Sequence, residues 1–274
     1  MIVSPLFNFP SADLVLRSAP SPHPVDFLVH RYVLSAASPF FALLFTLPQA
    51  PDDDDPRPII DVAESPETLE ALFRFIYPMI SPTINSRDQL VLLLDTATKY
   101  EMNVAIDALR QVLVEPRFLD ARPVWVYAAA TCFDLDEEAK IASRHTLGIN
   151  IHDDSSCEDI KLIPPSSYRR LLELHDRRSR EAIDLLHLPK DIRCVLCNGT
   201  YYAILWEPEW WRDFEKRAKE ELKARPCSDK IFSDTFLSKS AEAGCQRCRG
   251  NISDAREFLA SLKRDIDALP STVR

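Results

Sequence analysis

Two short cysteine motifs constrain this chain more than any other feature of its sequence. Cys194-Val-Leu-Cys197-Asn-Gly199 and Cys245-Gln-Arg-Cys248-Arg-Gly250 are two copies of the pattern C-x2-C-x-G, and they contain two of the chain's four glycines. Two residues between thiolates let one tight turn present both sulfurs to a tetrahedral ion, and glycine lets the backbone close around them. The pattern therefore predicts one structural zinc site whose ligands are Cys194, Cys197, Cys245 and Cys248.

The segment between the two motifs predicts a helical insertion that the metal would pin at both ends. A helical pattern over residues 208–225 places four apolar residues on one side: Trp211, Phe214, Ala218 and Leu222. Two other interpretations of the motifs remain open, which are two unrelated buried pairs or a redox-active C-x-x-C. We expect the remaining cysteines, Cys132, Cys157 and Cys227, to be ordinary thiols, and the cluster of Trp206, Trp210 and Trp211 to fill a core or to form a partner surface.

The distribution of charged and apolar residues limits the classes of partner and the cellular compartment that we expect for this protein. The net charge is −9, with 17 basic and 28 acidic residues before Leu188 and 16 basic and 14 acidic residues from it onward. Nucleic acid is therefore an unlikely main partner, because phosphate backbones bind clustered Lys and Arg. No apolar run approaches the roughly 20 residues of a membrane span, and residues 1–10 lack a signal-peptide layout. We expect a cytoplasmic or nuclear protein without a membrane partner, in a reducing compartment where cysteines bind metal more often than they form disulfides.

The first 115 residues predict an α+β unit. Short β-type runs at residues 13–17, 25–29 and 59–62 indicate a three-stranded sheet, and an acidic loop at residues 52–55 precedes the third run. Helices are expected to start after Ser38, Ser65 and Ser86, which have the side chains favoured at helix N-caps, and a further helix opens at Asn103. Leu69, Leu72, Phe73 and Ile76 recur at helical spacing.

Specific residues within this order of elements resemble a known family. These are Asp13-Leu-Val-Leu16, then the string from Phe27 to Leu34 with Ser38-Pro39-Phe40-Phe41, then Leu72-Phe-Arg-Phe-Ile-Tyr77. Together they resemble a BTB/POZ domain. The resemblance implies a non-enzymatic module for protein–protein interaction that self-associates and docks a partner protein. It also implies that Asp13, His30 and Arg31 lie near the interaction groove, with Asp13 and Arg31 as a charged pair.

The second half of the chain reads as mainly helical. Residues 123–130 carry Val124, Tyr127 and Ala128 on one stripe, residues 168–182 give another stripe, and both segments resemble the helical continuation of fungal BTB proteins. His175 and His187 have no second metal ligand at short spacing and are expected to be structural histidines. We therefore predict a BTB/POZ-like domain over residues 11–115, a helical extension over 116–187, and a helical region with the cysteine turns over 188–274.

Two further functions stay open beside an adaptor or regulatory scaffold. One is a transcription-related regulator whose cysteine region binds nucleic acid. The other is a substrate adaptor of a cullin-type ubiquitin ligase, although the segment Pro78-Met-Ile-Ser-Pro82 lacks the glycine turn common in the family. With four glycines the chain has no phosphate-binding loop and no nucleophile elbow, so we expect no enzyme and no small-molecule substrate.

Overall fold

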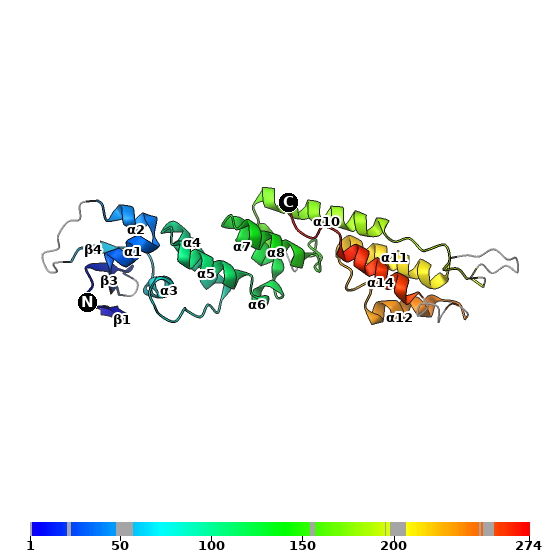
Figure 1. Ribbon diagram of the computed structural model, residues 1–274, viewed down its shortest axis with the longest axis horizontal. Coiled ribbons are helices and arrows are strands. Elements are labelled where there is room, and N and C mark those ends of the chain that lie inside the picture. The colour runs from blue at the N-terminus through cyan, green and yellow to red at the C-terminus, as the bar shows by residue number, and fades with distance from the viewer. Residues whose placement is uncertain are drawn as a thin grey trace. The chain divides into compact units, whose positions relative to one another are not determined.

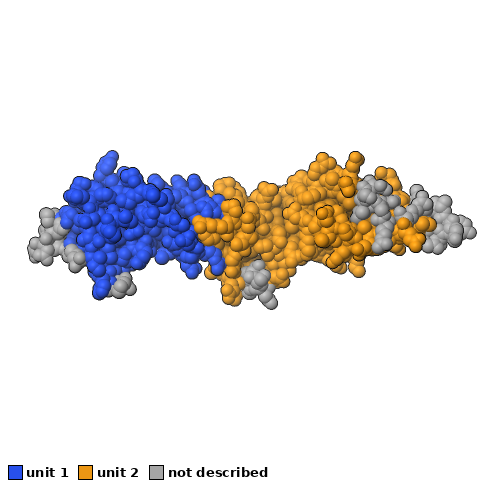
Figure 2. Space-filling model, turned by 90° about the horizontal axis from the view of Figure 1, so that it is seen from below, with its two compact units in different colours: residues 1–115 blue, residues 116–274 orange. Residues whose placement is uncertain are grey.

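The computed structural model describes residues 2–20, 23–47, 57–153, 157–194, 196–197, 207–246, 248 and 255–274. The chain divides into two compact units, residues 1–115 and residues 116–274 (Figure 2). Unit 1 contains the sheet, and unit 2 consists of helices and loops among the residues described. The predicted acidic loop at residues 52–55, and the two motif glycines Gly199 and Gly250, lie outside the described residues.

The sheet of unit 1 has four described strands in the order β1-β3-β2-β4. Figure 1 labels β1, β3 and β4 among them. Strands β2 (Leu14–Arg17) and β3 (Val25–Val29) are antiparallel, and β4 (Ile59–Asp61) runs parallel to β2. Between β2 and β3 the Arg17 guanidinium donates to the buried Asp26 carboxylate, with Nε to Oδ1 at 2.8 Å and Nη2 to Oδ2 at 3.2 Å. This bidentate pair fixes the register of the two strands.

The prediction of three strands is wrong by one, because strand β1 (Ile2–Asn8) pairs in parallel with β3 at the sheet edge. An edge strand tolerates Pro5, whose missing N–H would break an interior ladder. Only Ser4 and Phe7 are buried in β1, so the alternation that marks a strand is lacking. Phe7 packs against Phe27, Phe73 and Tyr77 with ring centroids 5.5–5.9 Å apart.

Five helices complete the described part of unit 1: α1 (Arg31–Ala37), α2 (Pro39–Leu44), α3 (Pro66–Ile76), α4 (Arg87–Lys99) and α5 (Asn103–Leu113). Three predicted N-caps are confirmed. The side-chain oxygens of Ser38, Ser65 and Ser86 each accept a hydrogen bond from the backbone N–H three residues later. Each cap satisfies a backbone donor that the first helical turn leaves unpaired.

Unit 2 begins with four short helices: α6 (Pro116–Leu119), α7 (Pro123–Cys132), α8 (Asp136–Thr146) and α9 (Cys157–Lys161). The prediction of a single buried stripe on α7 is too narrow, because every residue from Pro123 to Ala130 is buried. Its small alanines and large aromatic residues allow close packing on all sides of the helix.

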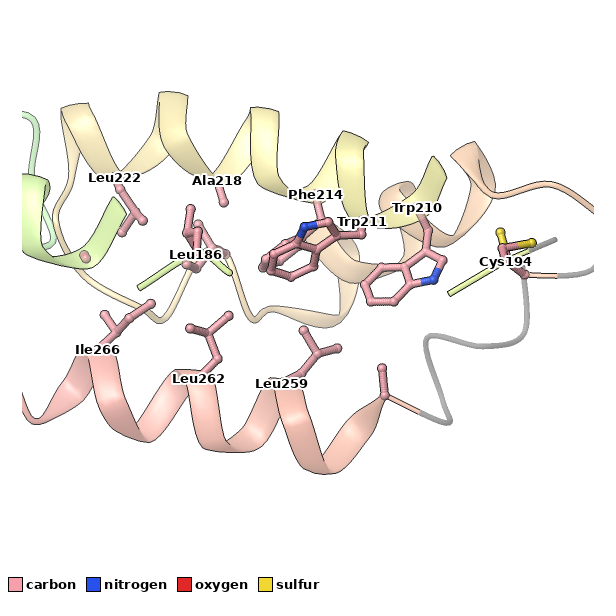
Figure 3. Close-up of a cluster of buried hydrophobic side chains, with 14 residues drawn as sticks. Leu186, Cys194, Trp210, Trp211, Phe214, Ala218, Leu222, Leu259, Leu262 and Ile266 are labelled. Carbon is pink, nitrogen blue, oxygen red and sulfur yellow. The ribbon is translucent and has the colours of Figure 1, made fainter. Parts of the chain in front are cut away.

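The rest of unit 2 is formed by α10 (Pro165–Asp184), α11 (Glu209–Ala224), α12 (Asp234–Ala243) and α14 (Arg256–Asp267). The predicted helix between the cysteine motifs is confirmed as α11, with its apolar residues buried. Trp210 and Trp211 fill a core rather than forming a surface, while Trp206 lies outside the described residues. Figure 3 shows this core, whose large side chains include Trp210, Trp211, Phe214, Leu222, Leu259, Leu262 and Ile266.

Candidate metal centre and interaction surface

The four predicted cysteine ligands come together from segments far apart in the sequence. Cys194 and Cys197 lie between α10 and α11, whereas Cys245 and Cys248 lie between α12 and α14. Their sulfur atoms all lie within 4.8 Å of one another. Helices α11 and α12 lie between the two cysteine pairs in the chain, and the fold brings the second pair back beside the first.

The sulfur separations suit a single tetrahedral ion. Sγ of Cys194 lies 3.6 Å from Sγ of Cys245, Sγ of Cys197 lies 3.5 Å from Sγ of Cys248, and the Cys245 and Cys248 sulfurs are 3.6 Å apart. A metal–sulfur bond of about 2.3 Å places the corners of a tetrahedron about 3.8 Å apart. The set is thus compatible with a closed metal site, in which four thiolates occupy every position.

The surroundings of the sulfurs combine burial with hydrogen-bond donation. Cys194 and Cys248 are buried, and Cys197 and Cys245 are partly exposed. Burial raises the pKa of the Cys197 and Cys248 thiols above its ordinary value, so a cation at the centre would be needed to hold them as thiolates. The backbone N–H of Glu209, the first residue of α11, donates to Cys197 Sγ at 3.4 Å. Such N–H donors orient sulfur ligands in metal–thiolate sites.

Trp210 supplies a second indication that this corner of the core is built for a polar group. Its side chain is fully buried, yet its indole nitrogen has no hydrogen-bond partner among the described residues. Trp210 belongs to the same packed cluster as Cys194 and Cys248, and its nitrogen lies on the side of the ring that faces Cys194 (Figure 3). A buried N–H without a partner is costly, whereas a nearby negatively charged sulfur would accept it.

Cysteines and histidines elsewhere in the described chain do not join this cluster. Within the described ranges, the four cysteines are the one group of three or more such ligands close enough to hold an ion. Cys132 is exposed and its thiol contacts the Leu162 carbonyl oxygen at 3.4 Å, while Cys227 is partly buried. The side chain of Cys157 lies outside the described residues. His175 is buried, and its Nε2 lies 3.0 Å from the Thr146 hydroxyl, whereas His187 is exposed.

In unit 1, Asp13 and Arg31 are in contact, but not as the predicted charged pair. The Asp13 carboxylate accepts the backbone N–H of Arg31 at 2.8 Å, at the first residue of α1. The Arg31 guanidinium instead donates to the Phe45 carbonyl oxygen at 3.0 Å and lies 5.0 Å from the centroid of the Phe45 ring. Asp13 is also exposed, so little free energy is lost by removing water from its carboxylate. From the sequence, the opposite charges of Asp13 and Arg31 suggested an ion pair between side chains. They could not show that the Asp13 carboxylate accepts the backbone N–H at the start of α1 instead.

His30 connects the sheet to the helices. Its backbone N–H donates to the Tyr77 hydroxyl at 2.9 Å, and its ring Nε2 lies 3.0 Å from the Ser11 hydroxyl. The His30 ring also packs against Phe9 at 5.3 Å. These contacts hold the strand-to-helix junction in place. Burial raises the pKa of the Tyr77 phenol, which keeps its hydroxyl neutral.

Exposed apolar side chains occur near the start of α1 and at and just after the end of α2. Tyr32 on α1 is 83% exposed, and Leu43 on α2 is 69% exposed. The contact between Arg31 and Phe45 places these two helix ends beside each other. We call the group formed by Tyr32, Leu43 and Leu47 the α1/α2 patch. Exposed apolar residues become an interaction site where they join into one contiguous patch.

Comparison with known proteins identifies unit 1. No curated protein matches the chain. Residues 13–117 match the sequence profile of the BTB/POZ domain, and they cover β2 to α5 of unit 1. BTB/POZ domains are non-enzymatic modules for protein–protein interaction. The family match, together with a small sheet surrounded by helices and a mostly helical remainder, shows that this chain contains a BTB/POZ domain at residues 13–117.

Proposed function

We propose that this protein is a non-enzymatic scaffold that forms a homodimer through its BTB/POZ domain and docks a partner protein. The observation that carries the proposal is the α1/α2 patch on a domain of an interaction family. Burial of Tyr32 and Leu43 against a second copy would remove apolar surface from water at about 25 cal/mol per Å². The site candidates Asp13, His30 and Arg31 hold the adjoining junction and would set the shape of this surface.

The self-association can be tested by sedimentation of the full-length chain. We expect a dimer at micromolar concentration, and we expect Tyr32→Glu with Leu43→Glu to weaken it at least about tenfold, which corresponds to about 1.4 kcal/mol. The control is Ile80→Glu, which places one such charge at an 84% exposed apolar residue outside α1 and α2, and it is compared with each single Glu variant. A monomeric parent chain, or equal weakening by the control, would contradict the proposal.

We also propose that the four cysteines bind one structural zinc ion. The support is the close spacing of the four sulfurs and the one backbone N–H, that of Glu209, which donates to Cys197 Sγ. Because four thiolates leave no open coordination position, zinc would hold the fold and would not activate water. Reduced thiols fit the cytoplasmic or nuclear location that we propose for the protein. Among the described residues, no helix is both long enough and apolar enough to cross a membrane.

A further inference from the structure

The two closest contacts between the cysteine turns each join a buried sulfur to a partly exposed one. Cys194 is 3% exposed and its sulfur lies 3.6 Å from that of the partly exposed Cys245. Cys248 is fully buried and its sulfur lies 3.5 Å from that of the partly exposed Cys197. In each pair, one cysteine is partly exposed to solvent and the sulfur of the buried cysteine lies beside its own sulfur.

We propose that a peroxide converts this centre into two disulfides, Cys194–Cys245 and Cys197–Cys248, with release of the metal. The inference rests on the zinc centre proposed above. It makes the four-cysteine cluster a redox-sensitive switch in the C-terminal part of unit 2.

One peroxide molecule oxidises each pair of thiolates to a disulfide. The exposed thiolate, of Cys197 or Cys245, attacks one peroxide oxygen, the O–O bond breaks, and a sulfenic acid and hydroxide form. The buried neighbouring thiolate then attacks that sulfur, the S–O bond breaks, and hydroxide leaves as the disulfide forms. Two thiolates thus lose two electrons and the peroxide gains them. Two such reactions consume all four thiolates, so the ion loses its ligands and is released as Zn²⁺.

Distance and exposure favour these two pairs over the other pairings. Exchanging partners between the turns would join the two buried sulfurs, Cys194 and Cys248, which solvent reaches least. Disulfides within each turn, Cys194–Cys197 and Cys245–Cys248, would include the 3.6 Å contact of Cys245 with Cys248. They would leave unbonded the two sulfur contacts that join the turns. Disulfides between the turns also keep residues 51 positions apart connected. The core shown in Figure 3 would then stay closed after the metal leaves, and reduction with added zinc would restore the centre.

Zinc-loaded full-length protein treated with hydrogen peroxide, then alkylated and digested with trypsin without reduction, tests the proposal. Trypsin leaves Cys194 and Cys197 together in residues 194–212 but separates Cys245 from Cys248 at Arg247. Disulfides between the turns yield residues 194–212 linked to both 240–247 and 248–249, and fragmentation between Cys194 and Cys197 assigns each partner. We expect this linked species, with about one zinc ion released for about two peroxide molecules consumed.

The outcomes separate this inference from the metal centre on which it rests. Zinc that stays bound under excess peroxide, or residues 194–212 carrying an internal disulfide, would overturn the redox proposal and leave the metal centre standing. Protein without zinc before peroxide is added would overturn both. Cys132→Ser is the matched control, because Cys132 is exposed but lies outside the cluster, and it should leave the release and the peptide map unchanged.

Discussion

The sulfur atoms of Cys194 and Cys245 lie 3.6 Å apart although the two residues are 51 positions apart in the chain. The intervening segment folds as α11 and α12, which pack through aromatic contacts such as that of Phe214 with Phe236. The cysteine cluster joins the two ends of this segment, and the aromatic contacts between α11 and α12 hold its middle together. Bringing the ends of a long loop together costs conformational entropy, so a metal ion that joins the two cysteine turns would stabilise this fold more than it would a short loop.

Removal of metal should destabilise unit 2 and spare unit 1. We expect a zinc chelator, or Cys245→Ser, to lower the free energy of unfolding of unit 2 by several kcal/mol. This is less than the roughly 10 kcal/mol that structural zinc gives to zinc-finger peptides, because the core around Trp210 and Trp211 remains. Elemental analysis and thermal melts check this, with Cys132→Ser as control. Zinc content that is low and does not fall in Cys245→Ser would contradict it.

Asp13 and Arg31 should contribute independently to stability. Asp13→Ala removes a carboxylate that accepts the first N–H of α1, and we expect a cost of about 1 kcal/mol. Arg31→Ala keeps that backbone N–H but loses the contacts with Phe45. The double variant should therefore equal the two single changes to within about 0.5 kcal/mol. A larger coupling in a double-mutant cycle on denaturant unfolding would restore the side-chain pair expected from sequence.

Local signals explain which parts of the fold were predictable from the sequence. Ser38, Ser65 and Ser86 mark helix starts because their hydroxyls satisfy backbone donors within three residues, and the C-x2-C spacing marks a sulfur turn for an equally local reason. Strand β1 carries no such signal, because its pairing with β3 depends on contacts between residues 20 or more positions apart. The arrangement of polar atoms was also unpredictable, as the donation of His30 N–H to Tyr77 shows.

Neither the α1/α2 patch nor the role of Trp210 could be inferred from residue types. Residue type alone does not place Tyr32 and Leu43 at the surface, and only the fold shows that they face solvent. That the Trp210 indole nitrogen finds no hydrogen-bond partner within the described ranges likewise depends on what surrounds it in three dimensions. The clustering of the four cysteines was predictable because the C-x2-C pattern fixes residue type and spacing as a metal site would require, whereas interaction surfaces fix neither.

Arg178 should be among the least replaceable residues of unit 2. Its side chain is buried, Nε donates to the Pro226 carbonyl at 2.8 Å, and Nη2 donates to the Ile266 carbonyl at 3.0 Å, with further donation from Nη1 to Leu269 and Pro270. Lysine has one compact ammonium and cannot reach all these carbonyls, so Arg178→Lys should cost about 3 kcal/mol. Urea unfolding measures this, and Arg180→Lys, on the exposed side of the same helix, should cost less than about 0.5 kcal/mol. Equal costs would show that the carbonyl contacts contribute nothing.

His175 should make the stability of unit 2 depend on pH. Its ring is buried, its Nε2 lies 3.0 Å from the Thr146 hydroxyl, and that hydroxyl donates to the Ser143 carbonyl, so Nε2 carries the proton that Thr146 accepts. Burial lowers the pKa of His175 to about 4 from its ordinary 6.5. Between these values the unfolded chain binds more protons than the folded one. The contribution is therefore intact above pH 6.5 and is lost as the pH falls toward 4, by up to about 3 kcal/mol.

His175→Gln keeps a hydrogen-bond donor but cannot titrate, so the difference in unfolding free energy between parent and variant should change across this window in denaturant titrations. A difference that stays constant from pH 7 to pH 4 would show that His175 remains accessible to protons in the folded protein.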